Sequence, residues 1–180
     1  MPGHGGASAP GVIDALRAVE VSHFVTVPDF VQLALHEAIE RGGSGMSLVR
    51  ACNEDQAVCI AAGLTIAGKR PIIAVQNQGL YACINSVRAV ALDACIPSVF
   101  LIGQFGRETS NFGRASTQSS RRVVSLLEPM LDTLGMPFWH LESDADLPSV
   151  ERAFDAARSR RGAAALIVGR PLTWNRESQQ

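Results

Sequence analysis

Short apolar runs alternate with amphipathic stretches along the chain. The apolar runs are four to seven residues long and predict strands at residues 23–27, 46–50, 71–76, 97–103, 138–141 and 164–168. The remaining patterned stretches carry apolar residues at helical spacing and predict helices at residues 12–21, 31–41, 54–67, 80–92, 121–134 and 147–160. Strands that alternate with helices in this way predict βαβ units and a parallel sheet. The runs IIAV and SVFLI are continuously apolar, which is typical of strands covered by helices on both faces.

The order of these elements predicts an α/β protein with a doubly wound, mainly parallel six-stranded sheet and helices on both faces. A chain of 180 residues has the length of one domain. We expect that domain at residues 12–170, with a flexible leader at 1–11 and a tail at 171–180. Hydrophobic residues make up 47% of the chain and charged residues 18%, which is enough apolar material for a full core.

Charge and hydropathy exclude several classes of partner. The chain has 16 basic and 17 acidic residues, so its overall charge does not attract nucleic acid or an anionic membrane. No apolar run approaches the roughly 20 residues that a membrane helix needs. The N-terminus lacks the charged and apolar regions of a signal peptide, and we expect a cytoplasmic protein.

The four cysteines form no metal-binding pattern. Cys52, Cys59, Cys83 and Cys95 include no C-x-x-C pair and have no histidine at ligand spacing. We expect them to be small buried hydrophobic residues, and we assign no metal ligand in this chain.

The stretch after Asn53 is unusual for a helix. It opens with Glu54 and Asp55, and the residues from Gln56 to Gly68 carry no charge. A helix that is apolar all round is buried on all sides, so another subunit is expected to cover part of it. Glu54 would then lie at the mouth of an interface. The simpler alternative is that Asn53 caps the helix and the two acids only complement its dipole.

Polar side chains follow the predicted strands at their carboxyl ends. The residues at these strand ends are Pro28 and Asp29, Cys52 to Glu54, Gln76 to Gly79, and Gly103 to Glu108. Ligands of open parallel sheets bind beyond the carboxyl ends of the strands. The pattern therefore predicts a site at one edge of the sheet.

The loop at residues 104–122 is long and carries four arginines: Arg107, Arg114, Arg121 and Arg122. A guanidinium can bind a sulfonate or phosphonate through two parallel hydrogen bonds. Loops of this kind are often simply solvated, and both interpretations stay open. Arg107 is the best candidate for a substrate contact because it lies nearest to the strand end.

The stretch from Gly63 to Lys69 fits G-x-x-x-x-G-K, yet it does not predict a phosphate-binding loop. Such a loop needs Ser or Thr next and must follow a strand, whereas Arg70 stands here and the stretch closes a helix. We interpret it as a helix C-terminus capped by Gly68.

Three motifs together resemble a known family. They are N-E-x-x-A-x-x-x-A-A-G from Asn53, a strand ending Q-N-x-G-L at Leu80, and a strand ending L-I-G-x-x-G-R-E at Glu108. This combination resembles the pyrimidine-binding domain of thiamine-diphosphate-dependent decarboxylases. It is most similar to the alpha subunit of sulfopyruvate decarboxylase and to phosphonopyruvate decarboxylase, and it implies the thiamine-diphosphate-binding fold.

The resemblance implies roles for individual residues. Glu54 matches the acid that hydrogen-bonds the aminopyrimidine ring of the cofactor and activates it. The cofactor-binding residues implied are Pro28, Asp29, Asn53, Glu54, Gln76, Asn77, Gly79 and Leu80. The substrate-binding residues implied are Gln78, Arg107 and Glu108. Gln78 stands where the family commonly has Ser, so this sequence departs from the family there.

The family holds Mg²⁺ and the cofactor diphosphate through a G-D-G segment in a second domain. No G-D-G occurs in these 180 residues. The resemblance therefore implies an alpha subunit of a 2-oxoacid decarboxylase, a carboxy-lyase that is active only with a diphosphate-binding beta subunit that holds the Mg²⁺. The implied substrate is a small anionic 2-oxoacid such as 3-sulfopyruvate or phosphonopyruvate. Two alternatives remain: a subunit of a thiamine-dependent carboligase, and a non-catalytic doubly wound homodimer.

Overall fold

Six strands form one sheet in the order β2-β1-β3-β4-β6-β5, and every neighbouring pair is parallel. The computed structural model describes residues 5–175. The strands are β1 His23–Thr26, β2 Ser47–Arg50, β3 Pro71–Gln76, β4 Ser98–Gly103, β5 Phe138–His140 and β6 Ala163–Val168. The predicted six-stranded α/β fold is confirmed, and its sheet is parallel throughout.

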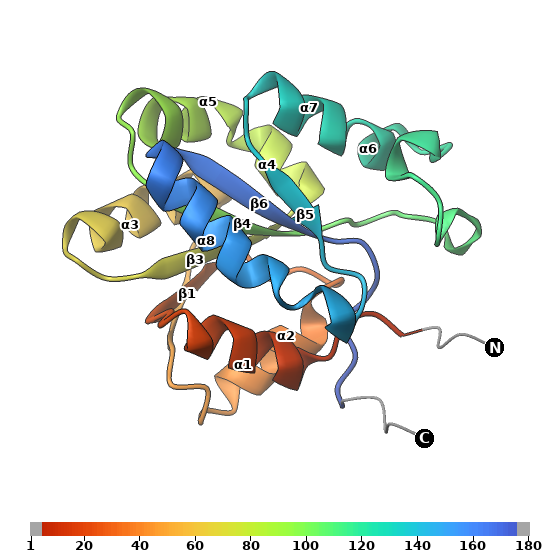
Figure 1. The fold of residues 1–180 in the computed structure, drawn as a ribbon, viewed down its shortest axis with the longest axis horizontal. Coiled ribbons are helices and arrows are strands. Elements are labelled where there is room, and N and C mark those ends of the chain that lie inside the picture. Colours follow the sequence, from red (N-terminus) through yellow and green to blue (C-terminus); the bar gives the residue numbers. More distant parts are fainter. Residues whose placement is uncertain (1–4, 176–180) are drawn as a thin grey trace.

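Helices cover both faces of the sheet (Figure 1). One layer consists of α1 Ala9–Ala18, α2 Leu33–Glu40 and α8 Ser149–Arg160. The other consists of α3 Glu54–Ile66, α4 Asn77–Ala82, α5 Ile84–Ser86, the π-helix η1 Val87–Asp93, α6 Arg122–Ser125 and α7 Leu127–Thr133. Short 3₁₀ turns at Thr109–Asn111, Ser116–Gln118 and Asp144–Asp146 lie in the loops.

Alternate strand residues supply the two halves of the core. Phe24 and Ile72 pack toward α1, α2 and α8, whereas their neighbours Val25 and Ile73 pack toward α3, α4 and α7. All of these side chains are almost fully buried. Because both faces are covered, the strands need no polar side, which explains their continuous apolar runs.

Local signals set both ends of α3. The side chain of Asn53 accepts a hydrogen bond from the Gln56 N–H at 2.8 Å and caps the N-terminus. At the other end Gly68 has φ of +75°, and the N–H groups of Gly68 and Lys69 donate to the Thr65 and Leu64 carbonyls. This is a Schellman C-cap, so the helix-end interpretation of the G-x-x-x-x-G-K stretch is correct.

Two predicted helices are interrupted. The helix predicted at residues 80–92 already begins at Asn77 and runs as α4, α5 and η1. The helix predicted at residues 121–134 divides at Leu126 into α6 and α7. Pro129 has no N–H to donate to the carbonyl four residues earlier, which accounts for the second interruption.

The expected leader at 1–11 and tail at 171–180 overlap with the folded domain. Ser8 caps α1, and a parallel bridge joins Ser8 to Thr173. The Ala9 N–H donates to the Thr173 carbonyl at 2.8 Å, and the Thr173 N–H donates to the Ala7 carbonyl at 3.0 Å. Residues near both ends are therefore part of the fold. The rest of those two expectations falls on residues 1–4 and 176–180, outside the described residues.

The expectation for the cysteines is wrong for three of the four. Cys83 is buried, whereas Cys52, Cys59 and Cys95 are exposed. Within residues 5–175, none of the helices combines the length and the apolar character that crossing a membrane requires.

Candidate functional site

The carboxyl ends of β1, β3 and β4 lie side by side because these strands are neighbours in the sheet. Asp29 follows β1, Asn77 follows β3 and Gln104 follows β4. Glu54 follows β2 and begins α3, which packs on β1 and β3. The topology therefore brings the predicted polar residues to one edge of the sheet.

Glu54 and Gly79 are in direct contact at this edge. A Cβ atom built on Gly79 would lie 2.2 Å from Oε1 of Glu54 and 2.5 Å from its Cδ, so only glycine leaves space for the carboxylate. Gly79 lies in the first turn of α4 and is not among the glycines with positive φ. Glycine is needed at this position because it has no side chain, not because of its backbone conformation. The Glu54 carboxylate has no hydrogen-bond or ion-pair partner within residues 5–175.

The neighbours of Glu54 have structural partners. Asn53 is the helix cap, and the Asp55 carboxylate accepts a hydrogen bond from the Ser86 hydroxyl, which ties α3 to α5. Of the two acids that open α3, Glu54 alone is free to meet a ligand in the part of the chain that the structure describes.

The stretch from Gln76 to Leu80 contains both buried and exposed side chains. Asn77 is fully buried, and its amide donates to the Phe105 carbonyl at 3.1 Å and the Val123 carbonyl at 2.8 Å. It thereby fixes the two ends of the loop after β4 against the end of β3. Leu80 belongs to the core, whereas Gln78 is exposed.

A buried polar cluster follows β1, next to the exposed Pro28. Asp29 is 6% exposed, and its carboxylate accepts hydrogen bonds from the Gln32 N–H at 3.0 Å and from the Gln32 amide at 2.5 Å. It lies against Gly103, where a Cβ would come within 2.7 Å of Oδ1. Burial raises the pKa of Asp29, opposed by its hydrogen bonds from Gln32 and Val31.

Gln32 and His36 were not predicted for this edge, and Gln104 was predicted only as part of the stretch from Gly103 to Glu108. Each is buried and has one polar side-chain atom without a hydrogen-bond partner among the described residues: Oε1 of Gln32, Nδ1 of His36 and Nε2 of Gln104. Such buried atoms normally have partners. Gln32 and His36 contact Asp29, whereas the Gln104 side chain accepts a hydrogen bond from Arg107 at 3.3 Å. The one signal in the sequence is polar residues next to strand ends.

His36 gives this cluster a pH dependence. Burial and, to a smaller extent, the Arg50 charge lower the pKa of His36 to about 4, while the Glu40 charge acts in the opposite direction. Between pH 6.5 and 4, His36 is protonated in the unfolded chain but stays neutral in the folded chain. We therefore expect the free energy of unfolding to fall by about 3 kcal/mol as the pH drops from 6.5 to 4.

Urea unfolding at several pH values measures this effect. Asp29 acts in the opposite direction, because a carboxyl with a raised pKa restores stability as the pH falls toward its ordinary value. The His36→Gln variant removes only the histidine contribution and should show a flatter profile between pH 6.5 and 4. The same slope in both proteins would exclude His36 as the source.

Arg107 points into the protein. Its side chain is 2% exposed, pairs with Glu142 and donates to the Asn111 side chain at 2.9 Å and the Arg114 carbonyl at 2.9 Å. Its guanidinium also lies 5.8 Å from the Phe112 ring centroid. These contacts hold the loop after β4 against the segment after β5, and they occupy the groups that an anionic substrate would need.

Glu108 has internal partners too. Its carboxylate accepts hydrogen bonds from the Ser119 hydroxyl at 2.7 Å and the Ser120 N–H at 2.9 Å. The Ser119 hydroxyl bond is the main cause that lowers the pKa of Glu108 to about 2. Glu108 therefore joins the start of this loop to its end through hydrogen bonds.

Arg107→Ala is expected to destabilise the fold. The variant removes the buried guanidinium that pairs with Glu142. Removal of one partner from a buried ion pair lowers the free energy of unfolding by about 3 kcal/mol. Urea unfolding measures the change. The matched control is Arg121→Ala in the same loop. Its side chain is exposed and, among the described residues, bonds only the Gly106 carbonyl, so the free energy of unfolding should change by no more than about 0.5 kcal/mol. Equal stability of the two variants would contradict an anchoring function for Arg107.

The sequence matches one described family: thiamine pyrophosphate enzyme, N-terminal TPP binding domain, over residues 8–126. The match covers the chain from the cap of α1 to the end of α6, including Asp29, Glu54 and Gly79. The chain therefore belongs to the thiamine pyrophosphate enzymes, as their N-terminal, pyrimidine-binding domain. No curated protein matches it.

Membership implies thiamine diphosphate as the cofactor, and the edge described above suits its pyrimidine end. The Glu54 carboxylate has no partner among residues 5–175 and lies against Gly79, which has no side chain, so this hydrogen-bond acceptor is open to a ligand. The diphosphate end is different. Within residues 5–175, no group of three His, Cys, Asp or Glu side chains could hold a metal ion.

Proposed function

We propose that this chain is the alpha subunit of a thiamine-diphosphate-dependent 2-oxoacid decarboxylase of the sulfopyruvate and phosphonopyruvate type. The observation that carries the proposal is the Glu54 carboxylate, which has no partner in the described part of the chain and lies against Gly79 at the carboxyl edge of a parallel sheet. The family match supports the cofactor class.

Glu54 supplies the acid–base function in this proposal. Its carboxylate shares a proton with a nitrogen of the aminopyrimidine ring and so controls the tautomer of that ring, while the cofactor supplies the electron sink. Gly79 leaves the space that the carboxylate occupies, because a Cβ at this position would displace it. Asp29, whose pKa is raised by burial, follows β1, which is the neighbour of the strand β2 that leads to Glu54, so both acids lie at the same edge.

The outward face of α3 is the proposed contact with the partner. Its exposed residues after Asp55 are Gln56, Cys59, Gly63 and Ile66, and none of them carries a charge. Ile66 is 75% exposed. An uncharged helix face of this kind, directly behind Glu54, is suited to burial against a second protein surface.

The loop after β4 is the proposed boundary of the substrate site. Arg107 and Glu108 hold it in shape through internal bonds, and Asn77 ties it to the end of β3. In this proposal Arg107 and Glu108 affect substrate binding through the loop that they order. Gln78, exposed in the first turn of α4, is the side chain proposed to contact the 2-oxoacid.

Reconstitution tests the proposal. The chain is mixed with a G-D-G-containing candidate beta subunit, thiamine diphosphate and Mg²⁺, and release of CO₂ from 3-sulfopyruvate, phosphonopyruvate and pyruvate is measured. We expect turnover only in the mixture. Ile66→Asp should prevent co-elution and turnover because it places a charge in the proposed interface. Turnover by the chain alone would reject the split site. Because a carboligase also releases CO₂ from a 2-oxoacid, the organic product is analysed as well, and a condensation product in place of the free aldehyde would identify a carboligase.

A further inference from the structure

A cavity lies at the opposite edge of the sheet, where β3 and β4 begin. It has a volume of about 500 Å³, which is within the usual range for small-molecule sites. Pro71 and Pro97 mark the strand ends that form its floor, and α1, the end of α3 and α8 form its walls. Since β3 runs from Pro71 to Gln76, this cavity lies on the order of 15–20 Å from the edge that carries Glu54.

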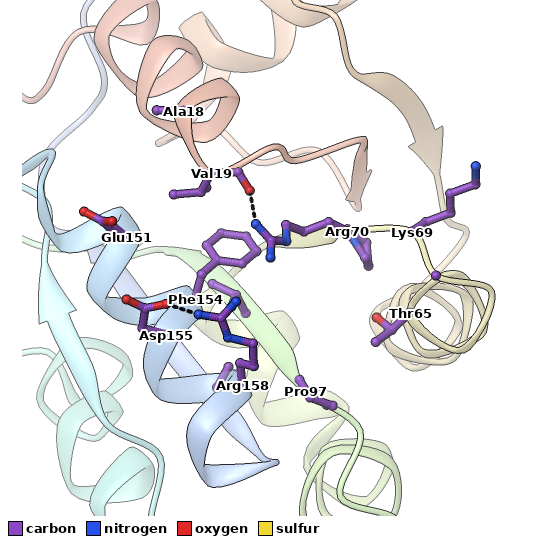
Figure 2. Close-up of a pocket in the computed structure, with 14 residues that line it drawn as sticks. Ala18, Val19, Thr65, Lys69, Arg70, Pro97, Glu151, Phe154, Asp155 and Arg158 are labelled. Carbon is purple, nitrogen blue, oxygen red and sulfur yellow. Dashed lines mark hydrogen bonds and ion pairs between the residues drawn. The ribbon is translucent and has the colours of Figure 1, made fainter.

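Two arginines and one aromatic ring converge in this cavity (Figure 2). Arg70, from the turn after α3, and Arg158, from α8, extend toward the Phe154 ring from two sides. The guanidinium carbon of Arg70 lies 6.0 Å from the ring centroid. Lys69 also contributes to the lining, but its side chain extends away from Phe154 in Figure 2.

Both guanidinium groups have only weakly held acidic partners. Arg158 pairs with Asp155 at 2.8 Å, with side chains 68% and 60% exposed. Arg70 lies 3.8 Å from Glu20, whose side chain is 87% exposed, and donates one hydrogen bond to the Val19 carbonyl. Exposed ion pairs of this kind contribute little, so a bound anion can replace them. Glu151, the other acid in the lining, lies at the far end from Arg158 in Figure 2.

We infer that this cavity binds a nucleoside monophosphate. The two guanidinium groups would hold the phosphate through charge-assisted hydrogen bonds, and the base would lie against Phe154. The cavity combines two features that this class of ligand needs: two guanidinium groups for the phosphate and the Phe154 ring for the base. The stretch from Gly68 to Arg70, which closes α3, contributes to the phosphate end. The site is separate from the cofactor edge and does not depend on the proposed decarboxylase function.

Calorimetric titration of the full chain, without partner or thiamine diphosphate, tests the inference with AMP, adenosine and inorganic phosphate. AMP should bind saturably, and the other two about tenfold more weakly or worse, because each supplies only half of the contacts. Arg158→Glu should weaken AMP binding by about tenfold or more. Phe154→Leu should leave AMP no tighter than phosphate.

Arg152→Glu is the matched control, since Arg152 is exposed on the same helix and does not line the cavity. It changes the net charge by the same amount as Arg158→Glu and should leave AMP binding unchanged. Three results would overturn the inference: no saturable AMP binding, phosphate binding as tight as AMP, or equal losses in the two variants. Thermal unfolding of each variant confirms that the fold is intact.

Discussion

Glu54→Gln is expected to lower decarboxylation by the reconstituted enzyme by about 10²–10⁴-fold, the usual contribution of a positioned general acid–base group. The amide keeps the size of the side chain and the start of α3 but cannot share a proton with the cofactor ring. The stability of the chain should barely change, because an acid at a helix N-terminus contributes only about 0.3–1 kcal/mol. The measurements are the steady-state rate and the melting temperature of the same preparations.

Asp55→Asn is the control for this prediction. It removes the neighbouring negative charge from the same helix turn, and the new amide oxygen still accepts the hydrogen bond from Ser86. Its activity should stay close to that of the unchanged protein. Equal rates in the Glu54 and Asp55 variants would mean that Glu54 only complements the helix dipole, and the proposed function would lose its main support.

Gly79→Ala is expected to lower the same activity by about 10²-fold through Glu54, since a misplacement of about 1 Å can have that effect. The added Cβ would lie 2.2 Å from the Glu54 Oε1, so the carboxylate must move. The displaced atoms belong to a flexible side chain, and alanine favours a helix by about 1 kcal/mol over glycine. We therefore expect the fold to be kept while activity is lost.

The double variant separates a local effect from a general one. If Gly79 acts by positioning Glu54, the losses of Glu54→Gln and Gly79→Ala should not add in the double variant. Gly63→Ala, in α3 with no atom within 4 Å of the new Cβ, is the stability control and should make the isolated chain about 1 kcal/mol more stable. Additive losses would show that Gly79 acts independently of the carboxylate.

The proposed beta-subunit interface and the proposed nucleoside monophosphate site can be tested independently. Ile66 lies on α3 and is exposed in the direction proposed for the beta subunit, whereas Phe154 lies on α8 in the other helix layer. AMP binding needs no beta subunit, and decarboxylation needs no AMP. Loss of one activity in its own variants therefore says nothing about the other site.

Local patterns in the sequence determined the order of elements. Continuous apolar runs, helical spacing, the Asn53 cap and the Gly68 helix end are all decided within a few residues, so strand β3 and the start of α3 could be predicted to the residue. The prediction that marked residues meet at one edge follows from the parallel sheet, because the carboxyl ends of its strands share an edge. The interruption at Leu126 depends on Pro129 and was visible in principle.

Only the tertiary structure decided which way each side chain points. Arg107 was predicted to meet a substrate, but Glu142, which is 35 residues further along the chain, draws it inward. Three other features depend in the same way on elements far apart in sequence. They are the contact of Glu54 with Gly79, the burial of Asp29 against Gly103 and the exposure of Cys59 on α3. Periodicity reports which face of an element is apolar. It does not report which polar group from another element will lie opposite, because that is set by how the packed layers bring distant strand ends together.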